Sequence, residues 1–112
     1  METSLFDSNI LIERMRKGIK QLDGSTTIMN LIEFPKAVTI EGLDIIIPGT
    51  DDFDKGFEIS INLLGAGTPI PAVDIILAAV ALNRGMVLIT KDQHFKYVQK
   101  LYPEFKLQME KG

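Results

Sequence analysis

Four acidic residues of the 112-residue chain stand among apolar neighbours and are the first candidates for chemistry. They occur in the segments LFDSN, IMNLIEF, AVDIILAAVAL and ITKDQHF, and are Asp7, Glu33, Asp74 and Asp92. A buried, unpaired carboxylate costs several kcal/mol, so each must be paired, neutralised or bound to a metal ion. Carboxylate oxygens are the ligands that Mg²⁺ and Mn²⁺ prefer. These residue types therefore predict a divalent metal site if the fold brings them together.

Each acid also has a purely structural interpretation. Asp7 and Asp92 follow apolar runs and could be loop or helix-cap residues. Asp74 lies in the first turn of an expected helix, where the helix dipole favours an anion by roughly 0.3–1 kcal/mol. Glu33 could point to solvent from a short helix. Only the arrangement of the elements decides between these interpretations.

The composition of the chain excludes several other kinds of site. It has no cysteine, so disulfides, thiolate metal sites and a cysteine nucleophile are excluded. A single histidine, His94, argues against a histidine-based zinc site and a Ser-His-Asp triad. The net charge of −3 argues against binding nucleic acid by bulk electrostatics alone. Chemistry here falls to carboxylates and hydroxyls.

The length and hydropathy of the chain predict one soluble domain. At 112 residues, with 46% hydrophobic and 24% charged residues, it has the composition of a single globular domain spanning residues 1–112. No run of about 18 apolar residues predicts a membrane span. The sequence opens without a basic-then-apolar leader, so we expect a cytoplasmic location.

Apolar patterning and turn residues predict alternating strands and helices. The expected strands are residues 3–6, 25–29, 43–47, 86–90 and 105–109, the last at an edge of the sheet. The expected helices are residues 9–17, a short helix that contains Glu33 and ends near Pro35, and residues 51–64, 71–83 and 94–102. This rhythm predicts a three-layer α/β/α sandwich with a mainly parallel sheet of about five strands.

Local signals add detail to three of these segments. Ser8 or Asn9 is expected to cap the first helix, and Asp23-Gly24 to form a turn. In the 51–64 helix, one stripe typical of an amphipathic helix contains Phe53, Phe57, Ile61 and Leu64. The acids expected at the start or on the polar side of this helix are Asp51, Asp52, Asp54 and Glu58.

The predicted fold brings the four acids to one edge of the sheet. In a parallel α/β sheet, ligands bind outside the carboxyl ends of the strands. Asp7 and Asp92 follow two such ends, Asp74 begins the helix that leads to the second of these strands, and a helix after the second strand carries Glu33. Carboxylates crowded together raise one another's pKa, and a divalent cation removes that cost.

These segments together resemble the PIN-domain nucleases, in particular the compact VapC-like toxins. The resemblance rests on LFDSNILI, on TTIMNLIEF, and above all on the long ordered block PIPAVDIILAAVALNRGMVLITKDQHF. It covers nearly the whole chain. It implies the PIN-like α/β/α fold and places the family's acidic site residues at Asp7, Glu33, Asp74 and Asp92.

The resemblance also implies supporting residues and shows two departures. Asn9 and Thr90 match positions that orient the site, while Thr27 and Asn30 stand where the family often has Ser and Thr. His94 stands where many members have a further acid. The stretch between Glu33 and the strand at residue 43 is short, in a region that commonly shapes the substrate groove and the dimer contact.

The activity that the resemblance implies is that of a metal-dependent endoribonuclease, the toxin of a VapBC-type toxin–antitoxin pair. It implies one or two Mg²⁺ or Mn²⁺ ions, and with His94 replacing an acid we expect one firmly held ion and a second recruited with the RNA. It further implies a small antitoxin partner and a homodimer. His94 is also open to a surface or capping role, or to that of a general base.

Basic residues near the acids are candidates for phosphate contacts. Lys91 and Lys96 flank Asp92, and the densest basic cluster, on and after the first helix, contains Arg14, Arg16, Lys17 and Lys20. Charge on an exposed helix face is also ordinary.

Two alternatives to a nuclease stay open at this stage. One is a catalytically silent PIN-fold module whose acids bind a basic partner segment. The other is a phosphoacceptor receiver domain, since LDIIIPGTDDFDKG loosely resembles the strand and Pro-Gly stretch of receivers. Against it, Asp44 stands at the start of its strand, and the first strand is followed by one acid only, Asp7.

Overall fold

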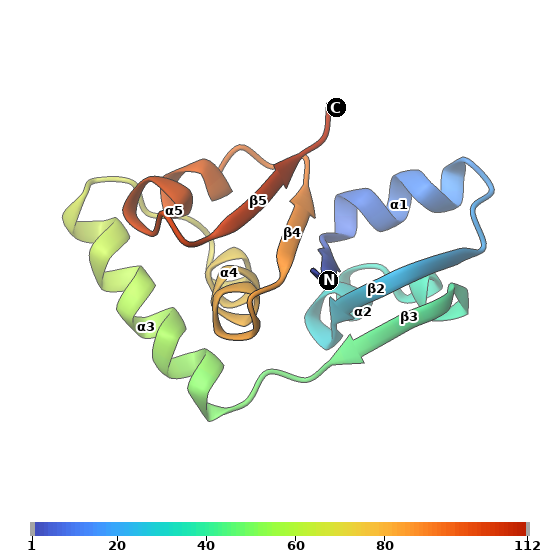
Figure 1. The fold of residues 1–112 in the computed structure, drawn as a ribbon, viewed down its shortest axis with the longest axis horizontal. Coiled ribbons are helices and arrows are strands. Elements are labelled where there is room, and N and C mark those ends of the chain that lie inside the picture. The colour runs from blue at the N-terminus through green and yellow to red at the C-terminus, as the bar shows by residue number, and fades with distance from the viewer. Residues whose placement is uncertain (1, 112) are drawn as a thin grey trace.

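The structure, a computed structural model, describes residues 2–111 and contains one parallel five-stranded sheet (Figure 1). Its strands are β1 (Ser4–Phe6), β2 (Gln21–Thr27), β3 (Glu41–Ile46), β4 (Val87–Thr90) and β5 (Lys106–Met109). Its helices are α1 (Ser8–Arg16), α2 (Ile28–Glu33), the 3-10 helix η1 (Pro35–Thr39), α3 (Thr50–Gly65), α4 (Ala72–Arg84) and α5 (Phe95–Leu101). The expected strands and helices are therefore present, with shifts of a few residues at their ends.

Side-chain alternation along the inner strands produces the two halves of the core. Leu5 pairs with Leu88 and Phe6 with Ile89, so that each pair points to its own face of the sheet. Leu5 and Leu88 pack with α3, α4 and α5, whereas Phe6 and Ile89 pack with α1 and η1. Both faces are covered, which confirms the three-layer α/β/α sandwich.

The strand order, β3-β2-β1-β4-β5, sets the place where a ligand can bind. The chain leaves β1 towards β2 on one side and returns to β4 on the other, so β1 and β4 form a topological switch point. Asp7 follows β1, and Asp92 lies just beyond β4. A receiver domain has instead the 2-1-3-4-5 order. The receiver alternative is therefore wrong.

The expected turn at Asp23-Gly24 is wrong, because both residues lie inside β2. The pairing register between β2 and β3 shifts there, as in a β-bulge. Gly24 has a φ of 153°, and a Cβ atom at this position would lie 2.7 Å from the Phe6 ring. The glycine therefore permits a bulge and a close contact within the strand, not a reversal of the chain.

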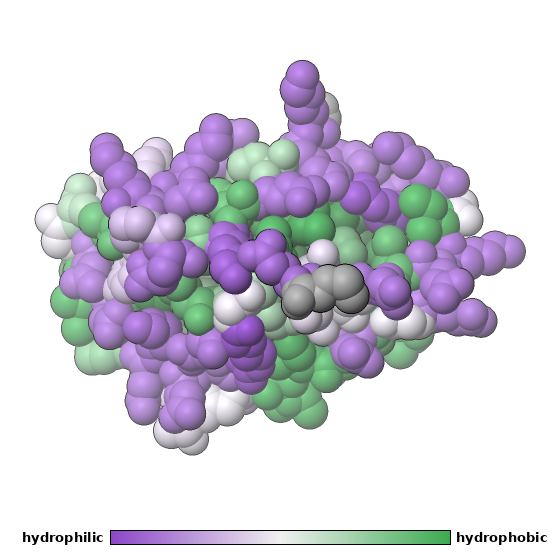
Figure 2. Space-filling view, in the orientation of Figure 1, coloured by the Kyte–Doolittle hydropathy of each residue, from purple (hydrophilic) through white to green (hydrophobic). Residues whose placement is uncertain are grey.

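Helix α3 carries two neighbouring stripes, and the stripe singled out in the sequence is the exposed one. Exposed fractions are 53% for Phe53, 71% for Phe57, 54% for Ile61 and 69% for Leu64. The buried face instead contains Gly56, Ile59 and Leu63. A Cβ atom on Gly56 would lie 2.7 Å from Ile76 Cδ1, so the glycine allows α3 and α4 to pack closely. In Figure 2, apolar surface gathers along the margin where α3 lies.

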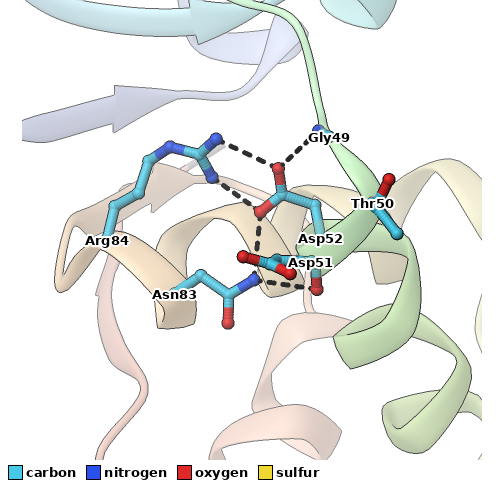
Figure 3. A pocket seen from close by; sticks show the side chains of 6 residues that line it. All are labelled: Gly49, Thr50, Asp51, Asp52, Asn83 and Arg84. Carbon is cyan, nitrogen blue, oxygen red and sulfur yellow. Dashed lines mark hydrogen bonds and ion pairs between the residues drawn. The ribbon is translucent and has the colours of Figure 1, made fainter.

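Asp52, expected among the surface acids of α3, is buried and paired. Its Oδ1 and Oδ2 accept from the Arg84 guanidinium at 2.7 and 3.0 Å, Asn83 Nδ2 donates to Oδ1, and the Gly49 N–H donates to Oδ2 (Figure 3). Burial raises the pKa of Asp52, but these hydrogen bonds outweigh it and hold the pKa below its ordinary value. The pocket of about 610 Å³ beside this cluster is lined by residues that join the start of α3 to the end of α4. We interpret the hydrogen-bonded cluster of Asp52, Arg84, Asn83 and Gly49 as a structural link between the two helices and call it the Asp52–Arg84 clamp.

None of the helices within residues 2–111 has the length and apolar character that a bilayer crossing requires.

Candidate active site

Asp7 is the buried centre of the candidate site. It caps α1, a role expected for Ser8 or Asn9, and that expectation is wrong. Its Oδ1 accepts from the Ser8 N–H at 2.8 Å and from Asn30 Nδ2 at 3.3 Å. Its Oδ2 accepts from the Thr90 hydroxyl at 2.7 Å and from Asn9 Nδ2 at 3.3 Å. The side chain is therefore held from both sides in one orientation.

Asp74 and Asp92 form the open part of the site together with His94. One ligand atom from each of the three residues lies within 4.8 Å of the others. The His94 Nδ1 atom lies 3.3 Å from Asp74 Oδ2 and 3.2 Å from Asp92 Oδ1. Asp74 stands in the first turn of α4, and Asp92 and His94 lie between β4 and α5. The sequence predicted the two acids here, whereas the participation of His94 was not assigned.

Thr90 and Asn9 connect the buried acid to the open group. The Thr90 hydroxyl that donates to Asp7 also accepts the Asp92 N–H at 3.0 Å. Asn9 donates to Asp7, and its Oδ1 accepts the Lys91 N–H at 3.2 Å. Asp7 lies outside the group of three, but its carboxylate accepts from Thr90 and Asn9, and the same two side chains accept the backbone N–H groups of Asp92 and Lys91. Asn9 and Thr90 occupy the positions expected of orienting residues.

A second chain of contacts connects Glu33 to the site. Asn30 Nδ2 donates to Ser8 Oγ at 2.8 Å, and Ser8 Oγ donates to Glu33 Oε1 at 2.8 Å. Thr27 and Asn30 form the capping box of α2, in which Thr27 Oγ1 donates to Asn30 Oδ1 at 2.6 Å. Thr27 therefore acts through Asn30. Glu33 is exposed and lies outside the group of Asp74, Asp92 and His94.

The electrostatics of the site oppose ionisation of two of the acids. Burial raises the pKa of Asp7 above its ordinary value, hydrogen bonds from Thr90 and Ser8 oppose this, and the charges of Asp92 and Glu33 add to it. Burial raises the pKa of Asp74 to about 6, the contact with His94 opposes this, and the charges of Asp7 and Asp92 add to it. The acids are therefore close enough to repel one another electrostatically. A bound cation would remove this repulsion.

The donor set of this edge fits a divalent cation. Two carboxylates and an imidazole converge in the open group, and further carboxylates raise the local negative charge. Oxygen donors suit Mg²⁺ and Mn²⁺, and imidazole suits transition metals. Among the described residues, every buried polar side-chain atom already has a hydrogen-bond partner. The side chains of Asp74, Asp92 and His94 are 16%, 30% and 46% exposed, so an ion can reach the open group from solvent.

The candidate RNA-binding cations differ in their availability. Arg14 forms two hydrogen bonds with the Glu110 carboxylate, at 2.9 and 2.7 Å. Lys91 and Lys17 both pair with Glu13, the latter at 3.4 Å. Lys96 is exposed on α5, and the structure shows no ion pair for it within residues 2–111.

Sequence reasoning missed the roles of Ser8, Glu13 and His94. Ser8 was considered only as a cap, but it joins Asn30 to Glu33. Glu13 pairs with Lys91 across 78 residues of sequence, a contact that no local pattern indicates. The sequence signal for His94 is its place two residues after Asp92, where the resemblance implies a further acid; in the structure its backbone N–H donates to the Asp92 carboxylate at 3.0 Å.

Comparison with family models gives no match, and comparison with curated protein sequences gives none either. Solved structures match over nearly the whole chain. VapBC2 from Rickettsia felis, bound to a DNA fragment from its promoter, is similar with a TM-score of 0.76 and 16% identity over 96% of this chain and 98% of that chain. VapBC-5 from Mycobacterium tuberculosis is similar with a TM-score of 0.73 and 16% identity over 100% of both chains. DNA-bound VapBC from Salmonella typhimurium has a TM-score of 0.72 and 18% identity over 97% of this chain and 98% of that chain. The chain therefore has the fold found in these toxin–antitoxin structures, as its resemblance to VapC-like PIN domains predicts.

Proposed function

We propose that this chain is a metal-dependent endoribonuclease, the VapC-like toxin of a toxin–antitoxin pair that acts on cytoplasmic RNA. One observation carries the proposal. Donor atoms of Asp74 and Asp92 lie in one group beside buried Asp7, at the switch point of a sheet that has the fold of VapBC structures. The finer parts of the proposal, the RNA substrate and the metal, derive from the chemistry of this group.

The residues proposed to hold the metal are Asp7, Asp74, Asp92 and Glu33. Together they would bind one or two Mg²⁺ or Mn²⁺ ions. When bound, such an ion neutralises the phosphoryl oxygens and lowers the pKa of the attacking water. Thr90 and Asn9 hold Asp7 in a fixed orientation. Ser8 donates to one oxygen of Glu33 and so orients this carboxylate, which would hold an ion through its second oxygen. Preorganisation of this kind lowers the reorganisation that the reaction requires.

The proposed RNA contacts follow from the charges around this edge. An acidic edge repels phosphate, so nearby cations must position the strand. Lys96 is the exposed candidate, whereas Arg14, Lys17 and Lys91 would have to exchange their carboxylate partners for phosphate. We therefore assign the first phosphate contact to Lys96.

The proposed protein partners are a small antitoxin and a second copy of the chain. Solved structures similar to this chain include the VapBC toxin–antitoxin proteins of Rickettsia felis, Salmonella typhimurium and nontypeable Haemophilus influenzae. In this chain, α3 exposes Phe53, Phe57, Ile61 and Leu64 along one side. Contiguous exposed apolar surface of this kind marks protein interfaces. We assign this side of α3 to the homodimer.

The direct test is cleavage of a total RNA pool by purified protein with Mn²⁺ or Mg²⁺, followed by mapping of the cut ends. We expect the wild type to cut in the presence of either ion and to be inactive with chelator. Asp74→Asn should lose at least about a hundredfold in rate, since it removes a proposed ligand. Asp51→Asn, an exposed acid at the start of α3, is the matched control and should cut at the wild-type rate.

The silent binding module predicts a different result. If structured and single-stranded RNAs stay intact with Mn²⁺, while Asp7→Asn still binds the same antitoxin as the wild type, the site binds a partner without catalysis. Retained cleavage in Asp74→Asn would instead contradict the assignment of the ligands.

A further inference from the structure

His94 places a nitrogen atom between the two acids of the open group. Its Nδ1 lies 3.2 Å from Asp92 Oδ1 and 3.3 Å from Asp74 Oδ2. Its backbone N–H donates to the same Asp92 oxygen at 3.0 Å, which fixes the residue relative to that carboxylate. The side chain is half-exposed, so the third side of the group faces solvent. The imidazole is thus part of the donor set.

The separations of His94 Nδ1 from the two carboxylate oxygens are close to those of neighbouring ligands around one ion, and the ligand atoms of all three residues lie within 4.8 Å of one another. With metal–ligand bonds of about 2.1–2.2 Å, adjacent ligands of an octahedral ion lie roughly 3.0–3.1 Å apart. The two nitrogen–oxygen distances of 3.2 and 3.3 Å exceed this by one to three tenths of an ångström. An ion can therefore replace the contact of His94 with the acids after only a small adjustment of the side chains.

We propose that His94 is a nitrogen ligand of the metal ion and makes the site selective for Mn²⁺ over Mg²⁺. Both ions favour oxygen ligands, but Mn²⁺ belongs to the first-row transition metals, whose affinity for nitrogen donors exceeds that of Mg²⁺ even at the weak, Mn²⁺ end of the series. An aspartate or glutamate in this place would give an all-carboxylate group without that preference. The inference rests on the metal site of the proposed function and adds the ligand and the selectivity.

The competing arrangement is a simple ion pair, in which an imidazolium neutralises Asp74 and Asp92 and no metal contacts the ring. The two arrangements differ in whether a nitrogen atom is directly bonded to the Mn²⁺ ion. A coordinated imidazole nitrogen produces ¹⁴N coupling in the pulsed electron paramagnetic resonance spectrum of Mn²⁺. Because His94 is the only histidine of the chain, coupling of this type identifies it without ambiguity in protein prepared without a histidine tag.

The experiment measures this coupling, together with the dissociation constants of Mn²⁺ and Mg²⁺, on the full chain. We expect imidazole ¹⁴N coupling in the wild type, its loss in His94→Asp, and a Mn²⁺-over-Mg²⁺ preference about tenfold smaller in His94→Asp. Lys100→Ala, an exposed residue of α5 with no assigned role in the site, is the control and should leave both quantities unchanged. Far-ultraviolet circular dichroism of each variant checks that the fold is retained.

The outcomes separate this inference from the proposed function. Mn²⁺ binding without imidazole coupling, or equal selectivity in the wild type and His94→Asp, would overturn the inference even if RNA is cut. Coupling and selectivity without RNA cleavage would support the inference and contradict the nuclease proposal alone.

Discussion

Asp74→Asn should stabilise the metal-free protein, because a site built to hold a cation is electrostatically costly without one. Burial, together with the charges of Asp7 and Asp92, raises the pKa of Asp74 to about 6 against the contact with His94. A carboxyl whose pKa is higher in the folded than in the unfolded chain destabilises the fold when it is ionised. Asparagine has a similar shape and no charge, so the variant should lose this penalty.

The magnitude follows from the pKa shift. A rise from 3.8 to about 6, at about 1.36 kcal/mol per pKa unit, corresponds to roughly 3 kcal/mol at pH values above 6. Asparagine also loses about 1 kcal/mol of favourable interaction with the helix dipole, which leaves a net gain of about 2 kcal/mol. For a domain of this size the gain corresponds to a melting temperature about 8 °C higher. The penalty is complete above pH 6 and disappears as the pH falls towards 3.8.

The assay is thermal unfolding in chelator at pH values from 7.5 to 4, for the wild type, Asp74→Asn and Asp54→Asn. Asp54 is an exposed acid on α3 and serves as the matched control. We expect the Asp74→Asn advantage to be largest at pH 7.5 and to be gone near pH 4, with Asp54→Asn unchanged throughout. Mn²⁺ should raise the melting temperature of the wild type more than that of Asp74→Asn. An advantage that is absent at pH 7.5, or equal at both ends of the range, would refute the reasoning.

Three further predictions concern regions outside the site. Arg84→Ala should lower the free energy of unfolding by about 2 kcal/mol, since it leaves the buried Asp52 carboxylate without its ion pair. Because the pKa of Asp52 is lowered in the folded chain, the difference in unfolding free energy between wild type and variant, measured by urea denaturation, should be full above pH 4 and shrink at lower pH. Gly56→Val should cost about 2–3 kcal/mol by forcing α3 away from α4, whereas Gly65→Ala, with open space around it, should not destabilise; equal stability of the two variants would contradict the packing account. Phe57→Ser should leave the melting temperature nearly unchanged but reduce the dimer fraction in light scattering, and an unaltered dimer would remove α3 as the interface.

Apolar patterning predicted the layers of the fold because burial on both faces leaves a simple signature. Strand β4 reads as a continuous apolar run, and helix α4 is apolar on nearly every side. The order of the strands was not readable from patterning alone. It is set by crossovers between segments distant in sequence, and it comes from the structure.

Patterning failed where a helix or strand departs from the simple rule of one buried face. Helix α3 has two apolar stripes. Because Gly56 has no side chain, α3 packs closely against α4, and this contact buries the stripe that contains Ile59 and Leu63. Asp52 has the position of an ordinary first-turn acid, and only its pairing with Arg84, 32 residues away, explains its burial. Gly24 follows an aspartate as turn glycines do, but forms a bulge because β3 pairs on both sides of it.

The candidate site was predicted by residue type, and its connections were not. The motif predicts Asp7, Thr90 and Asn30 as site residues, and in the structure Thr90 and Asn30 donate hydrogen bonds to the Asp7 carboxylate; their roles in a reaction stay predictions. The position of His94 between two acids depends on the loop after β4, for which the sequence has no periodic signal.

The central claim is that this edge of the sheet is a divalent metal site, and a crystal of the protein soaked in Mn²⁺ tests it most directly. The anomalous difference map should contain a peak in contact with Asp74, Asp92 and His94, beside the buried carboxylate of Asp7. A map without a peak at this edge, at Mn²⁺ concentrations that support RNA cleavage, or a peak only at the Asp52–Arg84 clamp, would contradict the account.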